Sequence, residues 1–182
     1  SIRYALDNGC QRFDLFFMTG IKEQTPESIL ETVNYSRMLL ERFSTPNDHR
    51  LVPLISPMAP FLDPGSRAFE NPEKHGYHMF ARTLEEHRQL LLSPSWKYVL
   101  NYETKWLSRD QLVSTTYEAG RRLNEIKGSF GVISPDVAEA TDARIQKAIQ
   151  LIPEIDQIVL STPDIVEQKK KLADLKNWVN HA

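Results

Sequence analysis

Apolar and polar positions follow two different periods along the first 56 residues. Residues 12–18 are a short, almost continuous apolar run, which is typical of a strand covered on both faces, and residues 51–56 are a second such run. Between them, an apolar stripe is spaced by threes, fours and their sums, which indicates an amphipathic helix; its members are Ile29, Val33, Leu40 and Phe43. A strand, a helix and a strand in about 45 residues predict a βαβ unit with parallel strands and a right-handed crossover.

N-capping signatures predict where five helices begin. In each, a Ser or Thr is followed by Pro at the first helical position or by Glu or Gln three residues later. These signatures start at Thr25, Thr83, Ser108, Ser134 and Thr162, so residues 108–182 are predicted to be helical. The helix after Ser108 is expected to bury one face, made of Leu112, Thr116, Ala119, Leu123 and Ile126.

Two segments between these elements have weaker patterns. Residues 57–76 are rich in Pro, Gly and polar side chains and are predicted to be a long loop at the end of a strand. Residues 96–102 are predicted to be a third strand. The chain therefore divides into an α/β part, residues 1–107, and a helix-rich part, residues 108–182.

Composition excludes several classes of protein. With 22 basic and 24 acidic side chains the net charge is −2, so a nucleic-acid partner is not expected. No apolar run reaches the roughly 18 residues that span a bilayer, and no membrane partner is expected. Cys10 is the single cysteine, which excludes a disulfide framework or a cysteine-only metal site within this chain and fits a reducing, cytoplasmic location.

The strongest positional signal for a ligand is the turn at 19–25. It follows the first predicted strand and precedes a capped helix, where parallel α/β enzymes place ligands, although a purely structural turn has the same pattern. His75 and His78 have a spacing that can share a metal, but no third ligand is nearby, and both are expected to be solvated loop residues. His87, which follows Glu86, is expected to be solvated as well.

Three segments together resemble the second half of a radical S-adenosylmethionine (SAM) enzyme of the cobalamin-binding branch. The segment 8–25 is similar to a late barrel strand of that family, which ends in a Gly-Leu-Pro-Gly-Glu/Gln-Thr turn. The other two segments are 55–66, which reads Ile-Ser-Pro-Met-Ala-Pro-Phe-Leu-Asp-Pro-Gly-Ser, and 102–109, which reads Tyr-Glu-Thr-Lys-Trp-Leu-Ser-Arg. The resemblance covers roughly residues 1–130.

The resemblance implies a partial TIM-like barrel. In that family three cysteines early in the fold hold a [4Fe-4S] cluster, which binds SAM and reduces it to a 5′-deoxyadenosyl radical; cobalamin is a possible further cofactor. These cysteines are absent here, so the chain would be a fragment of an oxidoreductase or methyltransferase, without cofactors of its own and inactive alone. Its partners would be the remainder of the same polypeptide and an unidentified small-molecule substrate.

The resemblance also assigns candidate site residues. Phe17, Met18, Gly20 and Ile21 match the family positions nearest the adenine of SAM. Asp63 and Ser66, on the long loop, would face the substrate. Lys22 and Glu23 stand where the family has Pro and Gly, and the loss of a glycine suited to positive φ predicts a rebuilt turn.

Two other interpretations stay open. In the first, the chain is not an enzyme: the helical part is an interaction module whose apolar stripes are partly exposed and bind a second copy or a partner helix. In the second, the chain is a complete small α/β hydrolase or transferase, although the sequence has no recognisable nucleophile–base pair. A fragment with an open parallel strand edge is also expected to form a homodimer that covers it.

Overall fold

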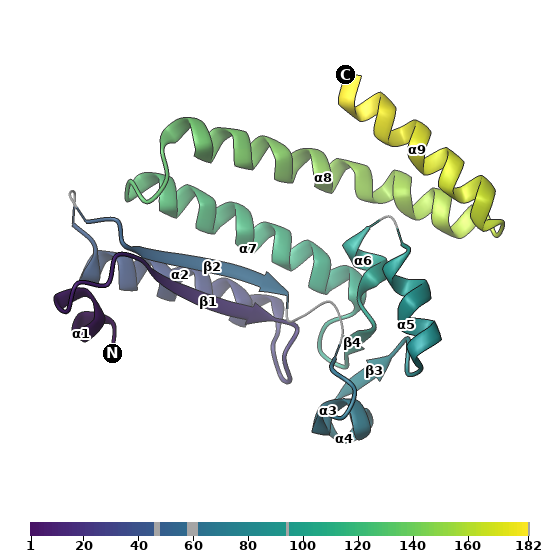
Figure 1. Ribbon diagram of the computed structural model, residues 1–182, viewed down its shortest axis with the longest axis horizontal. Helices are drawn as coiled ribbons and strands as arrows, with labels where there is room; N and C mark the ends of the chain where they lie inside the picture. The colour runs from purple at the N-terminus through teal and green to yellow at the C-terminus, as the bar shows by residue number, and fades with distance from the viewer. Residues whose placement is uncertain (46–47, 58–61, 94, 182) are drawn as a thin grey trace.

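The computed structural model describes residues 1–45, 48–57, 62–93 and 95–181, and 61% of the chain is helical (Figure 1). The mixed α/β class predicted from the sequence is confirmed. In chain order the elements are α1 (Ile2–Asp7), β1 (Phe13–Thr19), α2 (Pro26–Phe43), β2 (Leu51–Pro57), α3 (Arg67–Glu70), α4 (Pro72–His75), β3 (Tyr77–Met79), α5 (Leu84–Leu91), α6 (Trp96–Val99), β4 (Tyr102–Thr104), α7 (Arg109–Ser129), α8 (Pro135–Ser161) and α9 (Ile165–His181).

The predicted βαβ unit is confirmed. Strands β1 and β2 pair in parallel, with Phe13 opposite Leu51 at one end of the pairing. Helix α2 connects them and begins where the sequence predicts, because Thr25 and Ser28 form a reciprocal capping box ahead of the first turn. Within the described residues this parallel sheet has two strands and does not close, so the TIM-like barrel stays a prediction.

The two faces of the parallel sheet have different surroundings. Alternate β1 side chains, Phe13, Leu15 and Phe17, pack against the core on the side where α2 lies. The opposite face presents Phe16 and Met18, which are 57% and 50% exposed. In Figure 1 no described helix lies over that face, so part of the sheet is an open apolar surface.

Helix α7 completes the core and α8 lies outside it. The five α7 residues predicted to be buried are all buried, and they belong to the same hydrophobic cluster as Leu40 and Leu51 or line it. The core is therefore continuous across residue 107. Figure 1 shows α7 between β2 and α8, with α9 turning back from the end of α8.

Three sequence-based predictions about secondary structure are wrong. Residues 96–102 are not one strand, since they contain helix α6 and then the start of β4, which pairs antiparallel with β3. The predicted loop 57–76 contains the one-turn helices α3 and α4. Thr162 ends α8 rather than capping α9, whose first amides instead donate to Asp164 Oδ1 at 2.8 and 2.9 Å.

Candidate functional site

The turn from Thr19 to Thr25 connects the carboxyl end of β1 to the N-terminus of α2. Its first residue is fixed by a hydrogen bond between the buried hydroxyls of Thr19 and Thr116, whose oxygens are 2.9 Å apart. Its last residue, Thr25, caps α2. One end of the turn is thus anchored in the core and the other at the start of α2, and the residues between them project from the sheet.

One residue of this turn has a left-handed backbone conformation although it is not a glycine. Glu23 has φ 66°, and it is the only non-glycine residue with positive φ in the described chain. A side chain disfavours that conformation by roughly 1–2 kcal/mol, so the surroundings must hold it in place. Glu23 therefore adopts a positive φ although it is not a glycine, and the rebuilt turn stays a prediction.

Gln24 closes the turn from within. Its amide nitrogen donates to the carbonyl oxygen of Met18 at 3.0 Å, and its amide oxygen accepts from the backbone N–H of Ile21 at 3.2 Å. The backbone N–H of Gln24 in turn donates to the Ile21 carbonyl oxygen at 3.2 Å. One side chain thus ties together the two residues that bear the exposed apolar groups of the turn.

Two buried tyrosines, one from β3 and one from its antiparallel partner β4, lie beneath the turn. Tyr77 and Tyr102 pack edge to face with ring centres 5.5 Å apart. The Tyr77 hydroxyl oxygen accepts from the backbone N–H of Lys22 at 3.0 Å. Burial raises the pKa of Tyr77, an effect that the Lys22 N–H partly offsets, and burial also raises the pKa of Tyr102.

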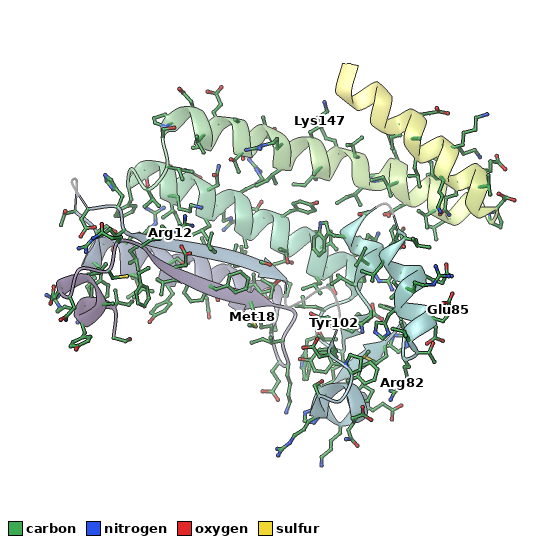
Figure 2. The ribbon with its side chains drawn as sticks, in the orientation of Figure 1. Arg12, Met18, Arg82, Glu85, Tyr102 and Lys147 are labelled. Carbon is green, nitrogen blue, oxygen red and sulfur yellow. The ribbon has the colours of Figure 1, made fainter. Side chains whose placement is uncertain are left out.

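Tyr102 lies against Gly20 of the turn. Gly20 has φ +83°, and a β-carbon there would lie 2.6 Å from the Tyr102 hydroxyl oxygen and 3.0 Å from Leu112. The Tyr102 hydroxyl is fully buried and has no hydrogen-bond partner among the described residues. Glycine is therefore required at position 20 both by its backbone conformation and by the lack of space. Figure 2 labels Met18, at the end of β1, and Tyr102.

The four residues assigned to the adenine lie together in the chain but face two ways. Met18 and Ile21 are 50% and 38% exposed. Phe17 points to the opposite face, where its ring contacts Tyr35 of α2 with centroids 6.2 Å apart. Gly20 faces the core. The side chains available to a ligand at this turn are thus Met18 and Ile21.

The two residues assigned to the substrate lie at the start of α3. The Asp63 side chain is exposed. Ser66 is half-buried, and its hydroxyl accepts from the backbone N–H of Phe69 at 3.2 Å, so it caps the helix. Positions 58–61, the centre of the second family-like segment, lie outside the described residues.

A buried polar network escaped the sequence analysis. His87 is 7% exposed, so the prediction that it is solvated is wrong. Its Nδ1 lies 2.8 Å from the Thr83 carbonyl oxygen, which can only accept, and its Nε2 lies 2.8 Å from the Asn101 amide nitrogen. Asn101 Oδ1 in turn accepts from the backbone N–H of Leu62 at 2.8 Å. The network holds the chain just ahead of Asp63 to α5 and β4.

A second cluster of charged groups joins α6 to α8. Lys97, which is 7% exposed, donates to Asp156 at 2.7 Å and also pairs with Asp110. Burial by itself would lower the pKa of Lys97, but the two carboxylates together outweigh it and raise the pKa. Tyr98 donates to the other Asp156 oxygen at 2.7 Å. All of these groups are used in joining helices, so the cluster is structural.

The structure provides no metal centre in the part of the chain it describes, since no three His, Cys, Asp or Glu side chains converge there. No helix among residues 1–45, 48–57, 62–93 and 95–181 is long and apolar enough to cross a membrane. Comparison with known protein families, with curated proteins and with solved structures found no match to this chain. The family resemblance therefore depends on the residues of the chain alone.

Proposed function

We propose that this chain is part of a radical SAM enzyme of the cobalamin-binding branch, to which it contributes two late barrel strands and the turn beside the adenine. The observation that carries the proposal is the backbone of Glu23. The family turn has Gly at this position, and Glu23 here has a left-handed conformation, which suits Gly and which a side chain disfavours. Residues held in strained backbone conformations cluster at active sites and ligand clamps.

The open face of the sheet supports the same proposal. Ligands of parallel α/β enzymes bind at the carboxyl ends of the strands. Here that end is formed by Met18 and the turn, and the apolar face beside it presents Phe16. We propose that the remainder of the same polypeptide, which would include the earlier strands of the barrel, covers this face and pairs with the free edge of β1.

The residues present fit one part of the cofactor set. Met18 and Ile21 offer exposed apolar surface suited to the flat adenine ring, and Gln24 holds their backbones at a fixed separation. Cys10 cannot join a cluster at the turn, because it precedes β1 and the strand separates them by roughly 20 Å. When bound, the [4Fe-4S] cluster and SAM would supply radical chemistry, with all cluster ligands from outside this chain. A cytoplasmic, reducing location suits such a cluster.

The roles of this chain would be to bind and to orient. Met18 and Ile21 would contact the adenine and exclude water from it. The loop that carries Asp63 and Ser66 would face the small-molecule substrate, and the His87 network would fix where that loop begins. Without the cluster-binding cysteines the chain is inactive alone.

The decisive experiment uses the full-length protein. We expect its coding sequence to contain an upstream Cys-x3-Cys-x2-Cys motif, and the anaerobically purified protein to hold about four irons and four sulfides per chain. With SAM and a reductant it should release 5′-deoxyadenosine. A full-length protein without those cysteines, or without iron, would overturn the proposal.

A matched pair of variants tests the turn within that protein. Met18→Glu places a charge where the adenine is assigned and should abolish 5′-deoxyadenosine release. Leu160→Glu makes the same kind of change at a side chain of α8 that is 78% exposed, and should leave release unchanged. Equal activity of the two variants would remove Met18 from the site.

One observation favours the second candidate, a helical interaction module. None of the 27 residues of α8 is fully buried, and Leu160 and Val166 are each 78% exposed. Exposed apolar helix faces of this kind bind partner helices or second copies. Under this alternative the parallel sheet is a scaffold and the α8–α9 surface is the functional part.

Self-association of the 182-residue chain separates the two candidates. We expect the chain to form a homodimer through the open sheet face and the free edge of β1. Light scattering should then show a monomer for Phe16→Glu and a dimer for Leu160→Glu. The reverse result would favour the helical module, and a monomeric parent chain would count against both surfaces.

A further inference from the structure

The antiparallel pair of strands β3 and β4 follows the parallel unit in sequence, yet it contacts the proposed cofactor turn directly. Gly76 has φ +76° and ends α4, and a β-carbon there would lie 2.5 Å from the ring of Trp106. The backbone N–H of Lys105 donates to the Gly76 carbonyl oxygen at 2.9 Å. These contacts fix where β3 begins and therefore where its first residue, Tyr77, is placed.

Tyr77 holds the turn through one hydrogen bond. Its side chain is 8% exposed, and its hydroxyl oxygen accepts from the backbone N–H of Lys22 at 3.0 Å. Lys22 immediately precedes Glu23, the residue with the strained backbone. The hydrogen bond between β3 and the turn thus lies next to the residue whose backbone conformation must be held in place.

Tyr102 holds Tyr77 and limits the turn at a second point. Its ring packs edge to face on Tyr77, and its hydroxyl lies against Gly20 without a hydrogen-bond partner in the described part of the chain. Its contribution to the turn is therefore shape. The two tyrosines differ in one respect that an experiment can use: within the described residues, one hydroxyl accepts a hydrogen bond from the turn and the other accepts none.

We infer that Tyr77 is a positioning residue, which sets the backbone of the turn at Lys22 and Glu23 so that Met18 and Ile21 present a fixed surface to the adenine of SAM. The β3–β4 pair beyond the parallel unit is then part of the cofactor site, although it contributes no side chain to the ligand. This inference depends on the proposed function for the identity of the ligand. Its structural half, the hold of Tyr77 on the turn, is independent of that function.

The structural half is tested by amide hydrogen exchange on the 182-residue chain. Tyr77→Phe keeps the ring and removes the acceptor, so exchange at the Lys22 amide should become at least about fivefold faster. Tyr102→Phe removes a hydroxyl that makes no hydrogen bond to the turn, and exchange at Lys22 should stay within about twofold of the parent. Amides of α2 serve as the reference for overall stability. Unchanged exchange at Lys22 in Tyr77→Phe would overturn the inference.

The functional half is tested in the full-length protein. Tyr77→Phe should raise the KM for SAM by about fivefold and leave kcat nearly unchanged. Tyr4→Phe removes the hydroxyl of a tyrosine in α1 that is 74% exposed, and should leave both unchanged. Faster exchange at Lys22 with an unaltered KM would overturn the role in SAM binding. A full-length protein that binds no iron and no SAM would overturn the proposed function, and the exchange result would then still decide whether Tyr77 holds the turn.

Discussion

Helices α7 and α8 lie side by side, but they have opposite relations to the core. Helix α7 has 21 residues, and eight of them are buried. Helix α8 has 27 residues, a more apolar sequence, and none that is fully buried. The helix with more apolar side chains is therefore the less buried of the two.

The difference comes from the number of neighbours on each side. Helix α7 lies between the sheet with α2 on one side and α8 on the other, so most of its surface faces protein (Figure 1). Helix α8 is covered by α7 along one side, and α9 meets it at one end. Apolar periodicity shows that a helix packs against something, whereas position within the layers decides how much is buried.

The largest expected effect comes from truncating one leucine in each region. Leu123 of α7 is 3% exposed, and Leu123→Ala should lower the free energy of unfolding by about 3–5 kcal/mol because it leaves a cavity. Leu160→Ala makes the same change in α8 at a side chain that is 78% exposed, and should change it by less than about 0.5 kcal/mol. Chemical denaturation measures both, and similar losses would mean that α8 is covered in solution.

A second pair of variants measures how tightly the inner region is packed. Gly20 and Gly65 have nearly the same backbone, with φ +83° and +84°, but a β-carbon at Gly20 would meet neighbouring atoms within 4 Å, whereas one at Gly65 would meet none among the described residues. Gly20→Ala should cost about 2–4 kcal/mol, from the backbone and from overpacking against Tyr102. Gly65→Ala should cost about 1–2 kcal/mol, from the backbone alone. Adding Tyr102→Phe to Gly20→Ala should recover part of the loss; no recovery would exclude the contact with the hydroxyl.

The parts of the fold that were predicted correctly are those specified by neighbouring residues. The capping boxes at Thr83 and Ser108 form as their sequences indicate, because cap and partner are three residues apart. The parallel pairing of β1 and β2 follows from the helix between them. Strands β3 and β4 were missed because each has three residues and is stabilised by its distant partner rather than by its own pattern.

The candidate site shows the same limit. The location of the turn, and the candidate residues Met18 and Ile21, could be read from the sequence. The two tyrosines that hold it could not, since Tyr77 is 55 residues from Lys22. His87 has a charged neighbour in the chain and looks solvated, but its burial depends on Asn101, 14 residues away. No local signal marks such residues, apart from glycines such as Gly20 that indicate a close approach.

A third comparison concerns a buried lysine of α6 and an exposed lysine of α9. Lys97, 7% exposed, links α6 to Asp156 of α8, and Lys97→Met should cost about 1–3 kcal/mol because it leaves two carboxylates without their cation. The expected loss of stability is modest because water screens Asp110, whose side chain is 75% exposed. Lys171→Met removes an exposed pair with Glu167 on α9 and should cost less than about 0.5 kcal/mol. Equal effects would show that the link to α8 has no special stability.

The smallest expected effect is a dependence of stability on pH, which compares the ion pair that holds α1 with the ion pair that holds α8. Arg50 holds Asp48 through two hydrogen bonds and donates to the carbonyl oxygens of Leu6 and Cys10, so the pair fastens α1 to the sheet. The hydrogen bonds from Arg50 lower the pKa of Asp48 to about 2. Because the folded-state value lies below that of the unfolded chain, the stabilisation is complete above about pH 4 and is lost as the pH falls towards 2.

Asp48→Asn provides the control for that dependence. Between about pH 6 and 4 the parent chain should be more stable than this variant by a constant amount, and the difference should shrink between about pH 4 and 2. Asp142 of α8, whose pKa is lowered chiefly by its hydrogen bond with Arg121 of α7, should show the same sign in Asp142→Asn. The effect at Asp142 should be smaller, because this pair joins α8 to α7 without also holding backbone carbonyls. A larger effect at Asp142 than at Asp48 would contradict this expectation. It would mean that α8 depends on its ion pair with Arg121 more than α1 depends on Arg50.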